Sequence, residues 1–168
     1  MNVRLATVDD LPQLTAVYEK IIASMYDENI QIWDEMYPCE FFSDDIENDR
    51  LYVLVENTEI ASAFALCNSS AGAHSVQWEN KQEKALYIER LGVNVNFLRK
   101  GIGSIMLTKA VALAREKGAA YVRLFVVDIN VPAIGFYIKN GFKRVEGSYD
   151  EIIGDGYNLH EFGFEIKT

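Results

Sequence analysis

The sequence predicts a single α/β domain that spans residues 1–168, and three observations lead to this prediction. Apolar, β-rich runs typical of strands alternate with segments in which apolar residues recur at helical spacing. The resulting order, β-α-α-β-β-β-α-β-α-β-β, contains no internal repeat and no linker. With 49% hydrophobic and 24% charged residues, the chain has the composition of a globular protein that can bury one core.

The chain begins with a short predicted strand at residues 3–6. Asp9 or Asp10 can cap the helix that follows, because the apolar residues after them keep helical spacing as far as Met25. Residues 27–39 interrupt this pattern and are unusually apolar and aromatic for a connection.

A second, acidic helix is expected at about residues 40–49. Residues 51–56 and 60–67 predict two strands, and the short polar segment between them predicts a β-hairpin. The polar residues 68–83 are expected to form a loop, and residues 84–95 form the next predicted strand.

A glycine-containing turn at residues 97–104 opens the next predicted helix, which Gly118 ends. Its buried face is expected to consist of Ile102, Ile105, Met106, Ala110, Leu113 and Ala114. Residues 121–127 are a near-continuous β-rich run, which is typical of a strand buried on both faces. Pro132 suits the first turn of a short helix that reaches Lys139.

Two closing strands are predicted at residues 142–146 and 159–166. Between them, residues 148–158 are expected to form an acidic loop. A run of this kind can attract a cationic ligand or can simply be solvated.

The composition excludes several classes of function. A net charge of −9 argues against non-specific binding to nucleic acid or to an anionic membrane surface. No apolar stretch approaches the roughly 20 residues that cross a bilayer. Cys39 and Cys67 lack metal-like spacing and fit a reduced, cytoplasmic protein. His74 and His160 lie far apart in sequence, so neither a zinc site nor a Ser-His-Asp triad is expected.

The turn at residues 99–104 has the features of an anion-binding site. Gly101 and Gly103 have no Cβ to keep a ligand away, and the first N–H groups of a helix lack internal partners. Arg99 and Lys100 add positive charge, although an ordinary strand-to-helix turn with a basic edge is the alternative. The spacing of the residues after Gly103 matches neither a dinucleotide fingerprint nor an NTPase phosphate loop.

Together with this turn, the segment from Asp128 to Phe142 resembles the GNAT superfamily of acyl-CoA-dependent N-acetyltransferases. The family spacing is matched by Asn130, Ala133, Tyr137, Gly141 and Phe142. The resemblance implies a central, mostly antiparallel sheet that is splayed at its middle strands, with helices on both faces. It also implies transfer of an acetyl group, without a metal, from acetyl-CoA to a primary amine of a small molecule, a polyamine or a peptide N-terminus.

By the same resemblance, the pantetheine arm of acetyl-CoA would pair with backbone groups of Val93 and Val95, and Asn130 would hydrogen-bond this arm. The pyrophosphate would rest on the turn, which consists of Arg99, Lys100, Gly101, Ile102, Gly103 and Ser104. The sequence departs from the family at Leu98, where Arg or Gln is usual. Because most pyrophosphate contacts come from backbone N–H groups, this departure is expected to weaken CoA binding modestly.

Tyr137 lies at the family position of a general acid that protonates the thiolate leaving group, and a core aromatic is the alternative. Glu89 is the best candidate for the base that deprotonates the amine, but an ion pair there, with a water chain as base, is equally open. Trp33 and Tyr37 resemble one wall of an acceptor pocket, or else a hydrophobic plug over the sheet.

Leu98 also motivates a competing function, a non-catalytic CoA-binding sensor or scaffold on the same fold. Transfer of a longer acyl group is a third option, because the sequence does not specify the room beyond the thioester. The oligomeric state is open too, and pairing of the closing strands across a homodimer is one option.

Overall fold

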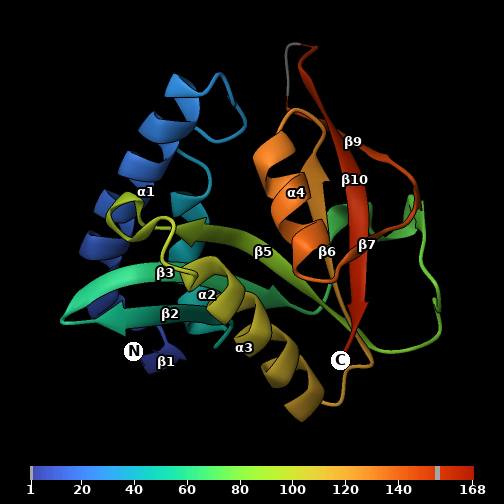
Figure 1. The fold of residues 1–168 in the computed structure, drawn as a ribbon, viewed down its shortest axis with the longest axis horizontal. Coiled ribbons are helices and arrows are strands. Elements are labelled where there is room, and N and C mark those ends of the chain that lie inside the picture. The colour runs from blue at the N-terminus through green and yellow to red at the C-terminus, as the bar shows by residue number, and fades with distance from the viewer. Residues whose placement is uncertain (1, 154–155) are drawn as a thin grey trace. The chain divides into compact units, whose positions relative to one another are not determined.

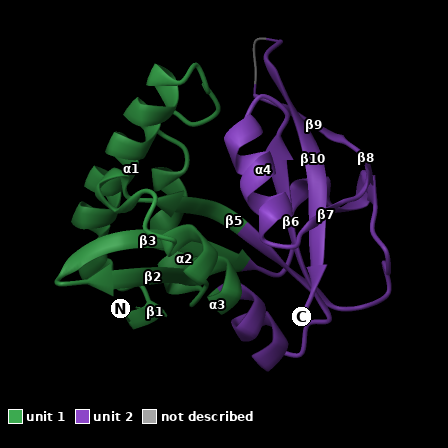
Figure 2. Cartoon of the chain, in the orientation of Figure 1, with its two compact units in different colours: residues 1–66, 89–109 green, residues 67–88, 110–168 purple. Residues whose placement is uncertain are grey.

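The computed structural model describes residues 2–153 and 156–168 (Figure 1). The chain divides into two compact units: unit 1 holds residues 1–66 and 89–109, and unit 2 holds residues 67–88 and 110–168 (Figure 2). Strand β5 (Ala85–Val93) and helix α3 (Ile102–Glu116) contribute residues to both units. The single domain over residues 1–168 stays a prediction, and each unit is described by itself.

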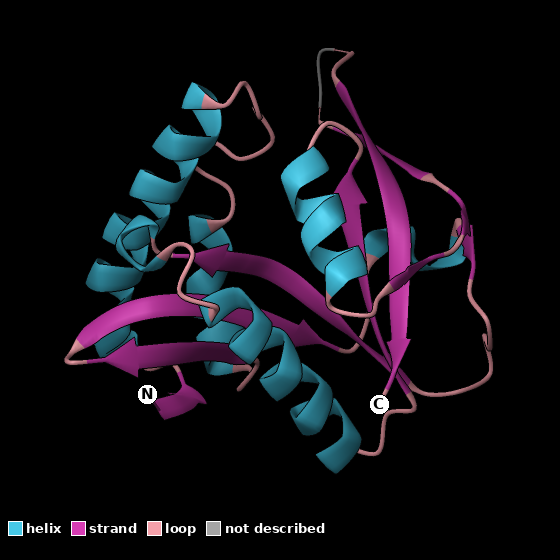
Figure 3. Cartoon of the chain, viewed as in Figure 1, coloured by secondary structure: helices cyan, strands magenta, loops and turns pink. Residues whose placement is uncertain are grey.

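Unit 1 is built on the strand order β1-β2-β3-β5, in which β2 pairs antiparallel with both β1 and β3. Its further elements are β1 (Asn2–Leu5), α1 (Leu11–Asp27), α2 (Phe42–Glu47), β2 (Leu51–Glu56) and β3 (Glu59–Cys67). Helices α1 and α2 lie behind these strands in the view of Figure 3, and the first turns of α3 lie in front of them. The antiparallel pairing of β2 with β3 confirms the predicted hairpin.

The two N-terminal helices differ from their expected bounds. A short 3-10 turn, Val8–Asp10, precedes α1, and Asp10 accepts a hydrogen bond from the Thr7 N–H (2.7 Å) instead of capping α1 with its side chain. Helix α2 is shorter than predicted. Its first expected residues form a 3-10 turn, and the Asn48 side chain donates to the Asp44 carbonyl (2.8 Å) where the helix ends.

The buried face of α3 is largely as expected, but Leu113 is only half-buried and Ile105 is exposed. Ile105 is 39% exposed, so its prediction as a core residue is wrong. Leu107 is buried instead. At about 100° per residue, Leu107 falls within the stripe that begins at Ile102, whereas Ile105 falls outside it.

Unit 2 is built on the strand order β5-β6-β10-β7, with β9 also paired to β10. Its further elements are β4 (Val76–Gln77), β6 (Tyr121–Val127), α4 (Val131–Lys139), β7 (Lys143–Arg144), β8 (Glu146–Gly147), β9 (Tyr149–Ile152) and β10 (Asn158–Lys167). The β5–β6 pair is parallel, and its ladder covers only Ala85 to Tyr87 of β5. A mixed, mostly antiparallel sheet that is interrupted at its middle strands is therefore confirmed.

Two predicted loops of unit 2 contain regular structure. Residues 68–83 include a 3-10 turn, Ala71–His74, and strand β4, which pairs with β8. The expected acidic loop contains β9, and its residues 154 and 155 lie outside the described residues. Close packing explains the first difference: a Cβ on Gly72 would lie 2.8 Å from the rings of Phe125 and Tyr149, so glycine lets this polar segment approach the sheet.

Candidate active site

The end of β5 presents the backbone groups that the resemblance assigns to the pantetheine arm. The Gly92 carbonyl accepts a hydrogen bond from the Ser62 hydroxyl (2.6 Å), and the Asn94 N–H donates to the Ala61 carbonyl (2.9 Å). Both residues thus face β3. Because the backbone groups of successive residues in a strand point to opposite edges, those of Val93 point away from β3. This orientation suits strand-like pairing with a ligand.

Val95 is placed differently. It begins a 3-10 turn, Val95–Phe97, and its carbonyl accepts from the Leu98 N–H (3.4 Å). The carbonyl of Val95 therefore already accepts a hydrogen bond within the 3-10 turn. The assignment of Val93 and Val95 to the cofactor arm stays a prediction.

Asn94, a residue that the sequence analysis missed, anchors this segment. It is 1% exposed, and its amide nitrogen donates to the Ile60 carbonyl (2.9 Å) and to Glu59 (3.1 Å). Its amide oxygen accepts from the Asn96 N–H (3.1 Å), and the Asn96 side chain also donates to Glu59 (3.1 Å). A polar residue between two valines in an apolar strand was the available signal.

The glycine turn has an open surface at its first glycine. Arg99 and Gly101 adopt left-handed backbone, with φ values of 61° and 76°. A Cβ added to Gly101 would meet no atom of the described residues within 4 Å, so none of them covers this position. The side chain of Ile102 is 2% exposed and fastens the first turn of α3 to the core. An open glycine followed by the unpaired N–H groups of a helix N-terminus fits a pyrophosphate.

The side chains of the turn differ in their exposure and in their contacts. Arg99 and Lys100 are both exposed, but the Lys100 ammonium lies 4.8 Å from the centroid of the Phe97 ring, so it already makes a cation–π contact with a residue outside the candidate anion site at 99–104. Gly103 and Ser104 are half-buried. Leu98 is 50% exposed, and its side chain offers neither charge nor hydrogen bonds where the resemblance implies a polar side chain.

Glu89, the candidate base, is half-buried on β5. The next residue, Arg90, has φ = 56°, which is uncommon for a residue other than glycine. This left-handed backbone breaks the regular alternation of the strand. In a regular strand Glu89 and Arg90 would point to opposite faces, but this rule does not apply where the alternation is broken.

In unit 2, Tyr137 lies on α4, a helix without fully buried residues among those described. Its ring contacts those of Phe136 (5.3 Å between centroids) and Phe142 (5.8 Å), but the residue is only half-buried. Tyr137 therefore packs against other aromatic rings, as the core-aromatic alternative predicts, but it also retains accessible surface. The role of Tyr137 as general acid stays a prediction.

Asn130 is the N-cap of α4. Its amide oxygen accepts a hydrogen bond from the Ala133 N–H (3.3 Å). Because an amide also carries two N–H donors, capping the helix is compatible with a second contact to a cofactor arm. The assignment to acetyl-CoA stays a prediction.

The aromatic segment of unit 1 forms a continuous line of rings. Trp33 stacks on the fully buried Tyr18 (5.7 Å), Trp33 contacts Tyr37 (6.4 Å), and Tyr37 contacts Phe41 (5.5 Å). Asp34 accepts the N–H of Tyr37 (2.8 Å) in a tight turn. Trp33 and Tyr37 are half-buried, so the line packs against the core on one side and keeps accessible surface on the other. This arrangement is compatible with both interpretations of Trp33 and Tyr37, a hydrophobic plug over the sheet and a wall of an acceptor pocket.

Other chemistries find little support in the part of the chain that the structure describes. Burial, and next to it the charge of Glu19, raises the pKa of the Cys39 thiol, which disfavours the nucleophilic thiolate. Among residues 2–153 and 156–168, no three His, Cys, Asp or Glu side chains are grouped as a metal site would require. The described helices are too short or too polar to span a membrane.

Comparison with known proteins identifies the family. The chain matches the model of the Acetyltransferase (GNAT) family over residues 14–142. YwnH of Bacillus subtilis (strain 168), named provisionally as a phosphinothricin acetyltransferase, is 27% identical over 173 residues, 99% of this chain and 100% of that protein. A streptothricin acetyltransferase of Streptomyces lavendulae is 33% identical over 95 residues, 56% of this chain and 45% of that protein. A GNAT family acetyltransferase from Streptococcus agalactiae 2603 has the same fold, with a TM-score of 0.78 and 18% identity over 99% of this chain and 95% of that one. This chain is therefore a member of the GNAT acetyltransferase family.

Proposed function

We propose that the protein moves an acetyl group from acetyl-CoA to a primary amine. The observation that carries the proposal is the open turn at Gly101, where left-handed backbone, the absence of covering atoms and a helix N-terminus occur together. Membership of an acetyltransferase family supports it. Val93, with its backbone directed away from β3, supports binding of the extended arm.

Acetyl-CoA supplies an activated thioester carbon. The neutral amine attacks this carbon, a C–N bond forms, and a tetrahedral intermediate results. The C–S bond then breaks, and the leaving thiolate takes a proton from the Tyr137 hydroxyl. The proton lost by the amine passes to Glu89, directly or through water. Each of these two residues is half-buried, so each retains the surface that such contacts need.

The acceptor that we propose is a cationic amine. From Asp27 to Asp49 every charged residue is acidic, and this segment includes Trp33 and Tyr37. A local excess of negative charge raises the concentration of cations near it. Two relatives are named for phosphinothricin and streptothricin, so both compounds belong in an acceptor screen beside a polyamine and a peptide with an unmodified N-terminus.

The test is amine-dependent release of CoA by the wild-type protein and by Tyr137→Phe. Loss of a general acid typically costs about 10²-fold or more in rate, so kcat should fall by at least this factor. Tyr26→Phe is the matched control, because it removes the same hydroxyl from a 46% exposed tyrosine of α1. Its kcat should equal that of the wild type.

Three results separate the alternatives. A Tyr137→Phe variant with unchanged kcat would refute the role of the hydroxyl. Binding of CoA without acetylation of any amine would favour the sensor or scaffold. The mass of the product with acetyl-CoA and longer acyl-CoA donors would identify the acyl group that is transferred.

A further inference from the structure

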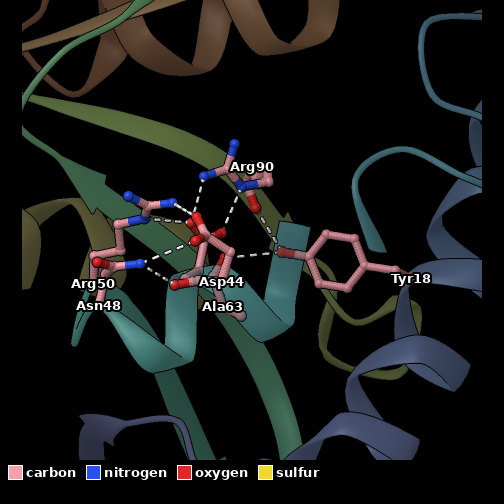
Figure 4. Close-up of polar contacts among 7 residues, drawn as sticks. Tyr18, Asp44, Asn48, Arg50, Ala63 and Arg90 are labelled. Atoms are coloured by element: carbon pink, nitrogen blue, oxygen red, sulfur yellow. Dashed lines mark hydrogen bonds and ion pairs between the residues drawn. The ribbon is translucent and has the colours of Figure 1, made fainter. Parts of the chain in front are cut away.

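Unit 1 contains a fully buried carboxylate that the proposed chemistry does not use. Asp45 of α2 is 0% exposed. Its two oxygens accept hydrogen bonds from Arg90 Nε (2.8 Å) and Nη2 (2.9 Å), and one of them also accepts from Arg50 Nε (2.6 Å). Figure 4 shows the side chains of Arg50 and Arg90, with dashed lines that mark their hydrogen bonds and ion pairs. A two-pronged arginine–carboxylate pair of this kind is strong and directional, and removal of one partner leaves a buried charge.

The same contact acts on the backbone of β5. Arg90 has a left-handed φ of 56°, which is unfavourable for a residue with a Cβ. Its carbonyl accepts a hydrogen bond from the Tyr18 hydroxyl (2.6 Å), which also lies 3.2 Å from the Ala63 carbonyl (Figure 4). Arg90 is thus held at its guanidinium by Asp45 and at its carbonyl by Tyr18. Strained backbone persists where the surroundings determine it in this way.

Two parts of the candidate site depend on this conformation. Glu89 shares a peptide group with Arg90, so rotation of the Arg90 backbone would reorient the strand at Glu89. The Arg90 guanidinium carbon also lies 5.1 Å from the centroid of Phe41, and Phe41 contacts Tyr37 at 5.5 Å. The Arg90 guanidinium therefore contacts the aromatic line, and Arg90 directly follows the candidate base along the chain.

We propose that Asp45 is a positioning residue for acetyl transfer. Through Arg90, it holds the β5 backbone at Glu89 and the ring of Phe41 in the arrangement that the incoming amine requires. The inference rests on the proposed function. It assigns Asp45 no contact with substrate.

The test compares Asp45→Asn with a matched control, Asp10→Asn. Asp10 also forms a two-pronged pair with an arginine of unit 1, Arg4 (2.7 and 2.8 Å), but this arginine lies on β1 and not on β5. Misplacement of a reacting group by about 1 Å can cost about 10²-fold, so kcat should fall tenfold or more in Asp45→Asn. The KM for acetyl-CoA should stay within about twofold, and kcat should be unchanged in Asp10→Asn.

A second variant and a double mutant keep the test decisive if Asp45→Asn folds poorly. Arg90→Lys keeps a positive charge beside Asp45 but cannot form the two-pronged contact, so its kcat should also fall while the fold is kept. If Asp45 and Arg90 act as a unit, Asp45→Asn combined with Arg90→Lys should lower kcat little more than the worse single variant does.

A crystal structure of Asp45→Asn provides a readout that does not need activity. We expect the Arg90 backbone to leave the left-handed region in this variant. Retention of that conformation together with wild-type kcat would overturn the inference and leave the proposed function standing. If the wild-type protein acetylates no amine, the proposed function and the catalytic part of the inference both fall, and the structure of the variant still shows whether Asp45 holds Arg90.

Discussion

Replacement of Gly101 by Ala tests the anion-binding turn with a control that the chain itself supplies. Gly101 and Gly118 have nearly the same left-handed backbone, with φ values of 76° and 73°, and a Cβ added to either meets no atom within 4 Å. Gly118 follows the end of α3 at Glu116 and takes no part in the turn. The two substitutions therefore carry the same conformational cost, and only Gly101→Ala places a methyl group on the candidate phosphate site.

The expected magnitudes follow from this geometry. A left-handed alanine costs about 1–2 kcal/mol, which lowers Tm by about 2–8 °C in a chain of this size. Acetyl-CoA at about 100 times its Kd stabilises the native state by about 2.7 kcal/mol, a shift of about 5–11 °C. If the methyl group at Gly101 weakens binding about tenfold, the same ligand concentration leaves about 1.4 kcal/mol, or half of that shift.

The assay is thermal unfolding of the wild-type protein, Gly101→Ala and Gly118→Ala, each with and without acetyl-CoA, with NAD and ATP as control ligands. Both variants should melt below the wild type by similar amounts. Only Gly101→Ala should lose half of the shift that acetyl-CoA produces. Equal ligand-induced shifts in all three proteins would refute the turn as the phosphate site. An equal loss of the acetyl-CoA-induced Tm shift in both variants would mean that backbone strain at the ends of α3, and not a methyl group on the phosphate site, causes the effect.

Two further predictions concern residues that the structure ties together in unit 1. Hydrogen bonds from the Arg4 guanidinium, and then from Thr7, lower the pKa of Asp10 from 3.8 to about 2. Since a lowered folded-state pKa stabilises above pH 3.8, Asp10→Asn should lose about 1 kcal/mol at pH 7, a value reduced by solvent screening because Arg4 is 40% exposed. In urea unfolding, the gap to the wild type should close between about pH 4 and pH 2, and a gap that persists at pH 2 would contradict this assignment. Asn94→Ala should raise the KM for acetyl-CoA because it releases the segment before the turn. Asn96→Ala, which removes a more exposed amide, should not, and equal KM values in both variants would contradict the anchoring role.

Much of the fold could be predicted from periodicity and breakers alone. The bounds of β6 agree with the predicted bounds to the residue, and the β2–β3 hairpin is found where two apolar runs flank a polar turn. Short elements escaped for a physical reason. Strands β4 and β9 have only two and four residues, half of them polar, so pairing with β8 and β10 and not their own sequence determines them.

The candidate site could be predicted in part. The glycine turn and Tyr137 follow a spacing that is visible in one dimension. Asp45 and Arg90 do not, because 45 residues separate them and each looks like an ordinary surface charge in its own segment. The left-handed backbone of Arg90 gives no sequence signal either, since glycine is the residue expected there.

A glycine occurs two residues later, at Gly92, where close packing and not a left-handed backbone requires it. A Cβ on Gly92 would lie 2.8 Å from Cζ of Tyr18 and 3.0 Å from Ile21, so glycine lets α1 approach β5 closely. This approach brings the Tyr18 hydroxyl to the Arg90 carbonyl. The sequence Arg90-Leu91-Gly92 therefore encodes a docking point for α1 on the strand that carries the candidate base.

The chain is consequently tied at two separate points on either side of Val93, the last residue of β5. Before it, Asp45 and Tyr18 hold Arg90, next to the candidate base and the aromatic line. After it, Asn94 is hydrogen-bonded to Glu59 and to the β3 backbone, shortly before the turn that we propose for the pyrophosphate. Because the two ties share no residue, their losses should separate kinetically: Asp45→Asn in kcat, and Asn94→Ala in the KM for acetyl-CoA. A variant of either residue that changed both parameters together would show that β5 moves as one rigid element, and the division of labour along the strand would then be wrong.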